Sequence, residues 1–93
     1  MNRRYMPSLI SMQCFEASAR HLSFTKAAEE LNITQSAVSK QVGQLEVILA
    51  TSLFQRVRKR LQMTQDGSIY LTEVTIVLTL VVMSIHYMLS YGS

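Results

Sequence analysis

The segment from Ser23 to Leu49 constrains the fold most, because its pattern is that of two helices separated by a very short turn. Ser23 and Thr34 are residue types that cap helix N-termini, and each stands directly before a helical pattern. Asn32, between the two patterns, tolerates the left-handed backbone conformation that ends a helix. Two helices joined by about three residues have the spacing of a helix-turn-helix. We therefore predict this unit at the centre of the chain.

A further helix is expected before this unit, over about residues 8–20. Pro7 and Ser8 favour a helix start, and apolar residues then recur at three- and four-residue spacing. This apolar stripe consists of Leu9, Met12, Phe15, Ala19 and Leu22. Cys14 lies in the same segment and is the only cysteine, so an internal disulfide is excluded and packing in the core is the expected role.

After Ser52 the pattern changes to two short alternating segments, residues 54–57 and 61–64. Three consecutive basic residues separate the segments, and we predict that the whole forms a two-stranded wing. Four of the nine basic residues of the chain belong to this region, namely Arg56, Arg58, Lys59 and Arg60.

Thr64 is the expected cap of a last helix, which reaches about Tyr91 with Gly92 beyond its end. The predicted fold is therefore mainly α. It is a winged helix-turn-helix of three helices and a two-stranded wing over residues 1–64, which we expect to bind DNA. A long linker and dimerisation helix follows over residues 65–93.

The third predicted helix has a polar side that suits the edges of DNA bases. Its inward residues are Val38, Val42, Leu45 and Leu49. An ordinary surface helix carries Glu–Lys pairs on its wet side, but this helix has no acidic residue from Gln35 to Leu45. Gln, Ser and Lys side chains can bond to base edges in the major groove. The predicted DNA-reading residues are Thr34, Gln35, Ser36, Ser39 and Lys40.

Two other segments are expected to bind the phosphate backbone. The start of the second helix offers free N–H groups and the positive end of a helix dipole, and it carries Ser23, Thr25 and Lys26. The second segment is the basic wing. A charge run alone is more often a solvated face, but beside a helix-turn-helix it favours contact with a DNA strand or with the minor groove. The net charge of +3 suits a polyanion without proving one.

The last predicted helix carries two apolar stripes. The first repeats at alternating three- and four-residue steps, which is the seam of a coiled coil, and we predict that it pairs with the same helix of a second chain. This seam consists of Leu71, Val74, Leu78, Val81, Ile85 and Met88. The second stripe consists of Ile76, Leu80, Met83 and Tyr87. A helix that is apolar on two sides is covered by protein or exposes an apolar patch, and any exposed remainder would favour association beyond a homodimer.

The sequence also bears on function classes other than DNA binding. His21, His86 and Cys14 lie at no ligand spacing, and the chain has no glycine-rich phosphate loop, so we expect no enzyme activity, no metal site and no cofactor. The run from Val74 to Leu89 has no charged residue and is slightly short for a membrane span, so a membrane-anchored DNA-binding module stays open. A further alternative is a helix-turn-helix that binds only protein. Binding of the chain to any DNA fragment would distinguish the DNA-binding hypothesis from this alternative.

The N-terminus indicates the compartment. Arg3 and Arg4 could open a secretory signal, but the residues after them never build an apolar segment. A single cysteine also fits a reducing compartment. We therefore expect a cytoplasmic protein.

The chain resembles the LysR-type transcriptional regulators over essentially its whole length. The segments that carry the resemblance are Phe24–Leu31, Thr34–Val42, Leu45–Glu46, Leu53–Arg56 and the step from Thr64 to Gly67. The resemblance implies a homodimer on an interrupted palindromic operator in double-stranded DNA. It also implies base or nearby contacts from the third helix, and contacts to the DNA backbone from the second helix and Arg56. The last helix would pack on the first helix of its own domain, which would cover part of the second stripe. An effector domain that the family implies after the linker has no counterpart in these 93 residues, so we expect no small-molecule effector site in them.

The sequence departs from the family pattern at several positions. Lys40 stands where arginine is commoner, which loses bidentate geometry. Ala50 and Ser52 stand where glycine and proline are usual, and the wing turn lacks its usual glycine. Gly43 weakens the recognition helix by up to about 1 kcal/mol relative to alanine. The last helix is also far less charged than is usual in the family.

Overall fold

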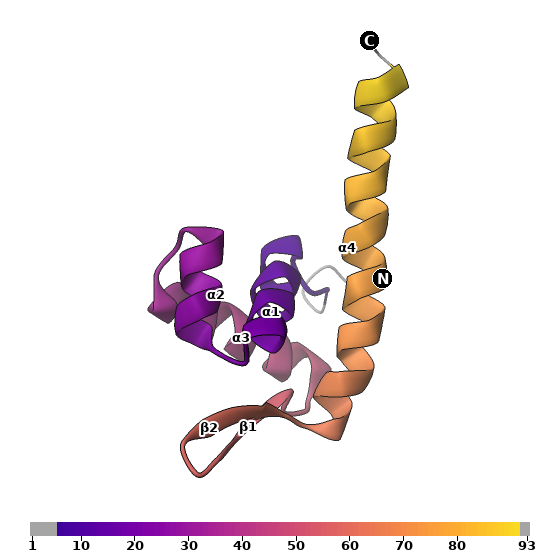
Figure 1. The fold of residues 1–93 in the computed structure, drawn as a ribbon. Helices are drawn as coiled ribbons and strands as arrows, with labels where there is room; N and C mark the ends of the chain where they lie inside the picture. The colour runs from indigo at the N-terminus through magenta and orange to yellow at the C-terminus, as the bar shows by residue number, and fades with distance from the viewer. Residues whose placement is uncertain (1–5, 92–93) are drawn as a thin grey trace.

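The computed structural model describes residues 6–91, which form four helices and one two-stranded sheet (Figure 1). Their order is α1 (Leu9–His21), α2 (Phe24–Leu31), α3 (Gln35–Leu49), β1 (Phe54–Val57), β2 (Arg60–Met63) and α4 (Gln65–Tyr91). Helices α1 to α3 pack together, the hairpin β1–β2 projects at one end, and α4 runs past α1 and extends in the opposite direction (Figure 1). The predicted mainly α, winged helix-turn-helix architecture is confirmed. Arg3, Arg4 and Gly92 lie outside the described residues.

The four helices begin at the polar residues that the sequence suggests. In each case the hydroxyl of the cap accepts a hydrogen bond from the N–H three residues along, at 3.0–3.1 Å, which satisfies one of the free donors of the first turn. These caps are Ser8, Ser23, Thr34 and Thr64. Asn32 ends α2 with a φ of 58°, in the left-handed region as expected. The predicted helix starts and the three-residue turn are therefore confirmed.

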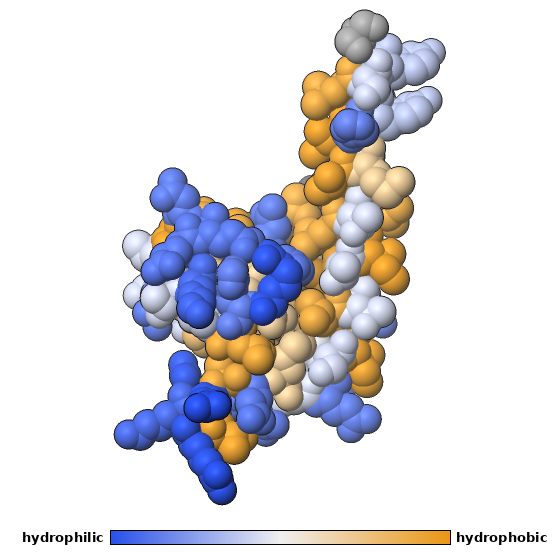
Figure 2. Space-filling view, viewed as in Figure 1, coloured by the Kyte–Doolittle hydropathy of each residue, from blue (hydrophilic) through white to orange (hydrophobic). Residues whose placement is uncertain are grey.

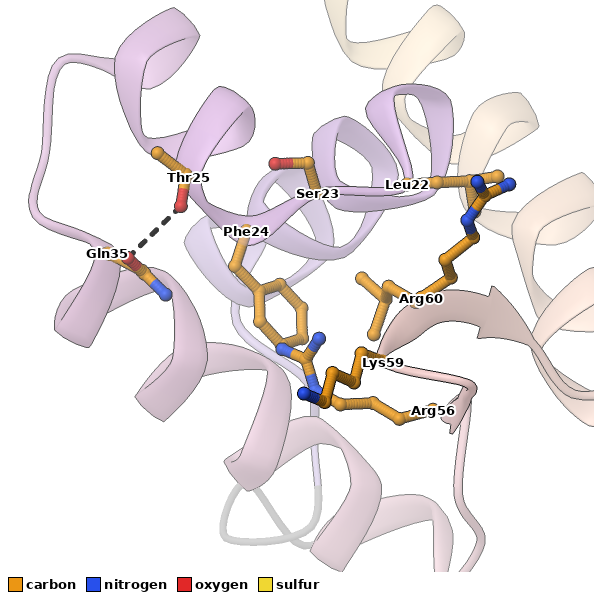
Figure 3. A pocket seen from close by; sticks show the side chains of 9 residues that line it. Leu22, Ser23, Phe24, Thr25, Gln35, Arg56, Lys59 and Arg60 are labelled. Atoms are coloured by element: carbon orange, nitrogen blue, oxygen red, sulfur yellow. Dashed lines mark hydrogen bonds between the residues drawn. The ribbon is translucent and has the colours of Figure 1, made fainter.

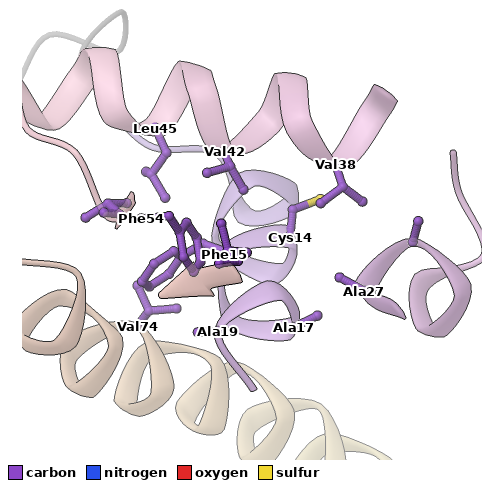
Figure 4. Close-up of a cluster of buried hydrophobic side chains, with 13 residues drawn as sticks. Cys14, Phe15, Ala17, Ala19, Ala27, Val38, Val42, Leu45, Phe54 and Val74 are labelled. Atoms are coloured by element: carbon purple, nitrogen blue, oxygen red, sulfur yellow. The ribbon is translucent and has the colours of Figure 1, made fainter. Parts of the chain in front are cut away.

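The core lies where α1, α3, the wing and α4 meet (Figure 4). The Phe15 ring of α1 is fully buried, and its centroid lies 5.5 Å from those of both Phe54 in β1 and Tyr70 in α4. Such tilted aromatic pairs add to the burial of the rings themselves. Cys14 is fully buried beside Phe15, as predicted, and its burial raises the pKa of the thiol.

The predicted apolar stripe of α1 is wrong at both ends. Leu9 and Leu22 are exposed, whereas two serines, Ser11 and Ser18, are buried. The physical reason is size, because small side chains on the inner face allow α1 to lie close to its neighbours. Leu22 has left the helix altogether, since it forms the C-cap with a φ of 49°.

Helix α3 agrees with the sequence analysis. Val38, Val42 and Leu45 are buried, and Leu49 is partly buried against the same core. Their spacing places them on one face of the helix, and that face packs on α1 and α2. The opposite face of α3 is exposed.

The hairpin is shorter at its turn than predicted. Strand β2 begins at Arg60 and not at Leu61, and Val57 pairs with Arg60, so only Arg58 and Lys59 form the turn. Both turn residues have positive φ, 52° and 66°. Two-residue hairpin turns with positive φ match the twist of the strands, which explains this register although no glycine is present.

A corner of hydrogen bonds joins α3, the wing and α4. The Glu46 carboxylate accepts from the N–H groups of Leu53 and Phe54, at 2.7 and 3.4 Å. The Leu53 carbonyl accepts from the N–H of Thr64 at 3.0 Å. Gly67 lies so close to Leu53 that an added Cβ would overlap the Leu53 carbonyl oxygen, so only glycine fits there. The start of α4 is therefore fixed in rotation as well as in position.

Where α4 packs on its own domain, its two apolar stripes face the opposite way from the prediction. Val74 is only 1% exposed, and Leu71 and Leu78 pack against the same core, so the predicted seam faces the chain's own domain over these three residues. The stripe expected to lie under α1 is exposed instead, at Ile76, Leu80, Met83 and Tyr87. Gly67 explains the reversal, because it lies seven residues before Val74 and turns that side of α4 inward.

The outer half of α4 extends beyond the globule with apolar surface (Figure 2). Ile85 and Met88, the last residues of the predicted seam, are exposed there, and Val81 is partly exposed. Within residues 6–91, α4 is the one helix long and apolar enough to cross a membrane by length and composition. Only 6% of its most apolar 18-residue window is buried.

Candidate nucleic-acid interface

Three segments that were predicted separately meet around one open cleft (Figure 3). The start of α2, the start of α3 and the wing enclose about 410 Å³. The polar and charged lining residues are Ser23, Thr25, Gln35, Arg56, Lys59 and Arg60. Among residues 6–91, no acidic side chain lines the cleft. A concave surface with cations and helix N-termini suits a phosphate-bearing ligand.

The cations of the wing are free to bind such a ligand. Arg56, Arg58, Lys59 and Arg60 are all exposed. The ion pairs found within residues 6–91 lie elsewhere and join Arg20 or His21 to carboxylates. The wing charges are therefore not neutralised by the described part of the chain, and each could pair with phosphate.

The acidic side chains nearest to α2 are engaged away from the cleft. The Arg20 guanidinium bridges Glu16 of α1 and Glu30 of α2, and His21 Nε2 lies 2.8 Å from a Glu30 oxygen. Arg20, with a further contribution from His21, lowers the pKa of Glu30 to about 2. This cluster ties the two helices together and pairs negative charge that would otherwise oppose a polyanion.

The capping residues of the interface already have structural roles. Ser23 Oγ accepts from the N–H of Lys26, and Thr34 Oγ1 accepts from the N–H of Ala37, both at 3.1 Å. Each hydroxyl still has a proton to donate. Capping and contact with a phosphate oxygen are therefore compatible at these two positions.

The remaining predicted residues continue the surface beyond the cleft. Ser36, Ser39 and Lys40 are exposed along the outer face of α3, opposite Val38 and Val42, but do not line the cleft. Lys26 and Arg58 are exposed and also lie outside its lining. The structure thus places Gln35 inside the cleft and the rest of the α3 set beside it.

Two features of the cleft were not predicted. Phe24 lines it, and its ring meets Phe54 of the wing edge-on at 5.5 Å, so it anchors the wing to α2. An aromatic residue directly after a capping serine was the available sequence signal. Thr25 Oγ1 donates to Gln35 Oε1 at 3.1 Å, a contact across the turn that no sequence spacing indicated. No group of three His, Cys, Asp or Glu side chains that could hold a metal occurs in residues 6–91.

Comparison with known sequences matches this chain to one family. The family model described as "Bacterial regulatory helix-turn-helix protein, lysR family" matches residues 9–68. The glycine cleavage system transcriptional activator of Escherichia coli K12 is 46% identical over 74 residues, which are 80% of this chain and 24% of that protein. The transcriptional activator AmpR of Citrobacter freundii is 52% identical over 67 residues, or 72% of this chain and 23% of that protein. The chain thus spans roughly a quarter of the length of these relatives.

Comparison with solved structures extends the match into α4. The DNA-binding domain of BenM in complex with catB site 1 DNA has a TM-score of 0.86 and 28% identity, and covers 92% of this chain and 97% of that one. The DNA-binding domain of CbnR in its DNA complex has a TM-score of 0.81 at 22% identity, with coverage of 92% and 99%. At that identity the second likeness shows the fold alone. Both are crystal structures of complexes with DNA.

Proposed function

Since the chain belongs to the LysR family of bacterial helix-turn-helix regulators, we propose that it binds double-stranded DNA and regulates transcription. The observation that carries the proposal is the cleft, where the N-termini of α2 and α3 meet an unpaired basic wing. The named relatives are transcriptional activators, and the BenM domain was crystallised with DNA. A cytoplasmic location follows from this function, because the DNA is there.

The proposed contacts divide into two classes. Gln35, Ser36, Ser39 and Lys40, with Thr34 at their start, face base edges in the major groove. Ser23, Lys26, the backbone N–H of Thr25 in the first turn of α2, and the wing cations Arg56, Arg58, Lys59 and Arg60 hold phosphates. Residues 1–64 then form the DNA-binding unit, and residues 65–93 form the linker and dimerisation helix. The operator is an interrupted palindrome that two such units read together.

The base-reading assignment is tested with Ser39→Ala and Lys40→Ala on a site selected from a random duplex pool. Each variant is expected to lose about 1–3 kcal/mol of binding free energy on the selected site and less on unrelated DNA. Ser68→Ala is the matched control, because Ser68 is exposed on α4 away from the cleft. Equal losses of binding free energy on the selected site and on unrelated DNA would mean that Ser39 and Lys40 contact only the DNA backbone. No binding to any duplex would refute the proposed function and favour a protein-binding role.

The phosphate assignment is tested by salt dependence. Each single alanine replacement in the wing is expected to flatten the slope of log affinity against log salt by about one unit where the cation meets a phosphate. Gln62→Ala is the control, because it shortens an exposed side chain of the same wing without removing a charge. Unchanged slopes for all four wing variants would remove the wing from the interface.

We further propose that α4 pairs with α4 of a second copy through its exposed stripe. Ile76, Leu80, Met83 and Tyr87 repeat at four- and three-residue steps, the spacing of a coiled-coil seam, and all are more than half exposed. Val74 cannot serve such a seam because it is buried in its own domain. A palindromic operator also calls for two copies, which an α4 pair would supply.

Changing both Leu80 and Met83 to Lys is expected to convert a dimer into monomers in sedimentation equilibrium, and to weaken binding to a two-half-site duplex. Thr75→Lys with Val82→Lys is the matched control, because it adds the same charge at exposed positions about a third of a turn around α4 from the stripe. A wild-type chain that sediments as a monomer would contradict the pairing. A wild-type chain that partitions into phosphatidylcholine vesicles would favour the membrane-anchored alternative.

A further inference from the structure

We propose that Thr25 is a positioning residue, which orients the Gln35 amide so that its NH₂ group meets acceptor groups on DNA. At the base pair that faces Gln35, guanine is then preferred over adenine. This inference rests on the proposed function and adds a specificity to the same site. It comes from one hydrogen bond across the helix-turn-helix, from Thr25 Oγ1 to Gln35 Oε1 at 3.1 Å (Figure 3).

The hydrogen bond joins the first turns of two helices. Thr25 is the second residue of α2 after its Ser23 cap, and Gln35 is the first residue of α3 after its Thr34 cap. Both side chains are exposed at the cleft. Figure 3 shows the Gln35 amide nitrogen on the side away from Thr25, toward the open cleft. The donor groups of the carboxamide therefore face the space where a base edge would lie.

The backbone holds the two side chains at this separation. Asn32 turns the chain with a φ of 58°, and the N–H groups of Asn32 and Ile33 donate to the carbonyls of Glu29 and Ala28, at 3.3 and 3.0 Å. This closes α2 and fixes the direction of α3. Thr25 is β-branched, so its χ1 angle has few alternatives. The hydroxyl is thus held in place before DNA arrives.

The orientation of the amide decides which base edge it fits. An unrestrained glutamine pairs with adenine by donating to N7 and accepting from the N6 amino group, and the second of these bonds needs Oε1. In this structure Oε1 points to Thr25 and the NH₂ group points outward. Guanine presents two acceptors, N7 and O6, which suit an NH₂ donor. Adenine would place its own amino donor against that NH₂ group.

The test compares affinities for duplexes that differ at one base pair. Gln35→Ala first identifies the position, since it should remove base preference there and nowhere else. The wild-type chain is expected to bind guanine at that position about tenfold more tightly than adenine. Thr25→Val keeps the shape of the side chain without its hydroxyl, and should reduce this ratio to near one or reverse it. Thr25→Ser, which keeps the hydroxyl, should retain most of the ratio.

The ratio of the affinity for guanine to the affinity for adenine reports the orientation of the Gln35 amide separately from any other role of Thr25. Loss of a phosphate contact would weaken binding to both duplexes equally and leave the ratio unchanged. A ratio unaltered by Thr25→Val, or a wild-type preference for adenine, would overturn the inference while the DNA-binding function stands. If the wild-type chain binds no duplex, the proposed function itself fails. Circular dichroism of Thr25→Val is expected to match the wild type, because the hydroxyl serves no helix cap.

Discussion

Helices α3 and α4 carry apolar residues at the same three- and four-residue spacing but use them differently. The single stripe of α3, including Val38 and Leu45, is buried against α1 and α2. Helix α4 has two such stripes, and only the one around Val74 is buried by its own domain. One stripe therefore identifies the inner face of a helix, whereas two equal stripes leave its rotation to be decided elsewhere.

For α4, the contact that decides the rotation of the helix is made by a residue that precedes both stripes. Gly67 packs on the Leu53 carbonyl at the corner that follows the wing, and no other residue type fits there. Val74 lies two helical turns further on the same side, so the stripe that continues from Gly67 faces inward. The opposite stripe, with Leu80, stays exposed. Three predictions test this comparison, from the largest expected effect to the smallest.

The first prediction contrasts one leucine from each helix. Leu45→Ala should reduce the free energy of unfolding by about 2–5 kcal/mol, because Leu45 is fully buried and the change leaves a cavity. Leu80→Ala should change it by less than about 0.5 kcal/mol, because Leu80 is 60% exposed. Urea unfolding at protein concentrations low enough to keep the chain monomeric measures both. Similar losses at the two positions would mean that the outer stripe of α4 is packed within one chain.

The second prediction contrasts the helical glycines. Gly67→Ala should destabilise the fold by more than about 1 kcal/mol, since the new methyl group would meet backbone and not a flexible side chain. Gly43→Ala in α3 should stabilise it by up to about 1 kcal/mol, because nothing lies within 4 Å and alanine favours the helix. Thermal and urea unfolding of both variants give the signs. If Gly67→Ala were as stable as the wild type, Gly67 could not be what orients α4.

The features that the sequence predicted correctly are those set by neighbouring residues. Ser23, Asn32 and Thr34 gave the two helices and their turn, because capping and left-handed residues act over three or four positions. The turn at Arg58 and Lys59 was placed one residue too long, since neither is the glycine that marks a tight hairpin.

Features that depend on distant segments were not predicted. The rotation of α4 depends on the Leu53 carbonyl, which has no sequence signature. The residue types of the candidate site were recognisable from their chemistry. The contact between Thr25 and Gln35 was not, because it depends on how two helices are placed and not on the spacing within either one.

The smallest expected effect lies at the end of α1 and α2, where ion pairs and not apolar stripes join the two helices. Arg20 and His21 lower the pKa of Glu30 from 4.5 to about 2, so the folded state holds this proton less tightly than the unfolded state. The resulting stability is fully present above a pH of about 4.5 and is lost as the pH falls through about 2. Because Glu30 is exposed to solvent the effect is small. Glu30→Gln should flatten the pH dependence of unfolding in that window, whereas Glu29→Gln, which removes a neighbouring carboxylate with no ion pair in residues 6–91, should not. Equal slopes for the two variants would show that the α1–α2 end is held by its apolar contacts alone.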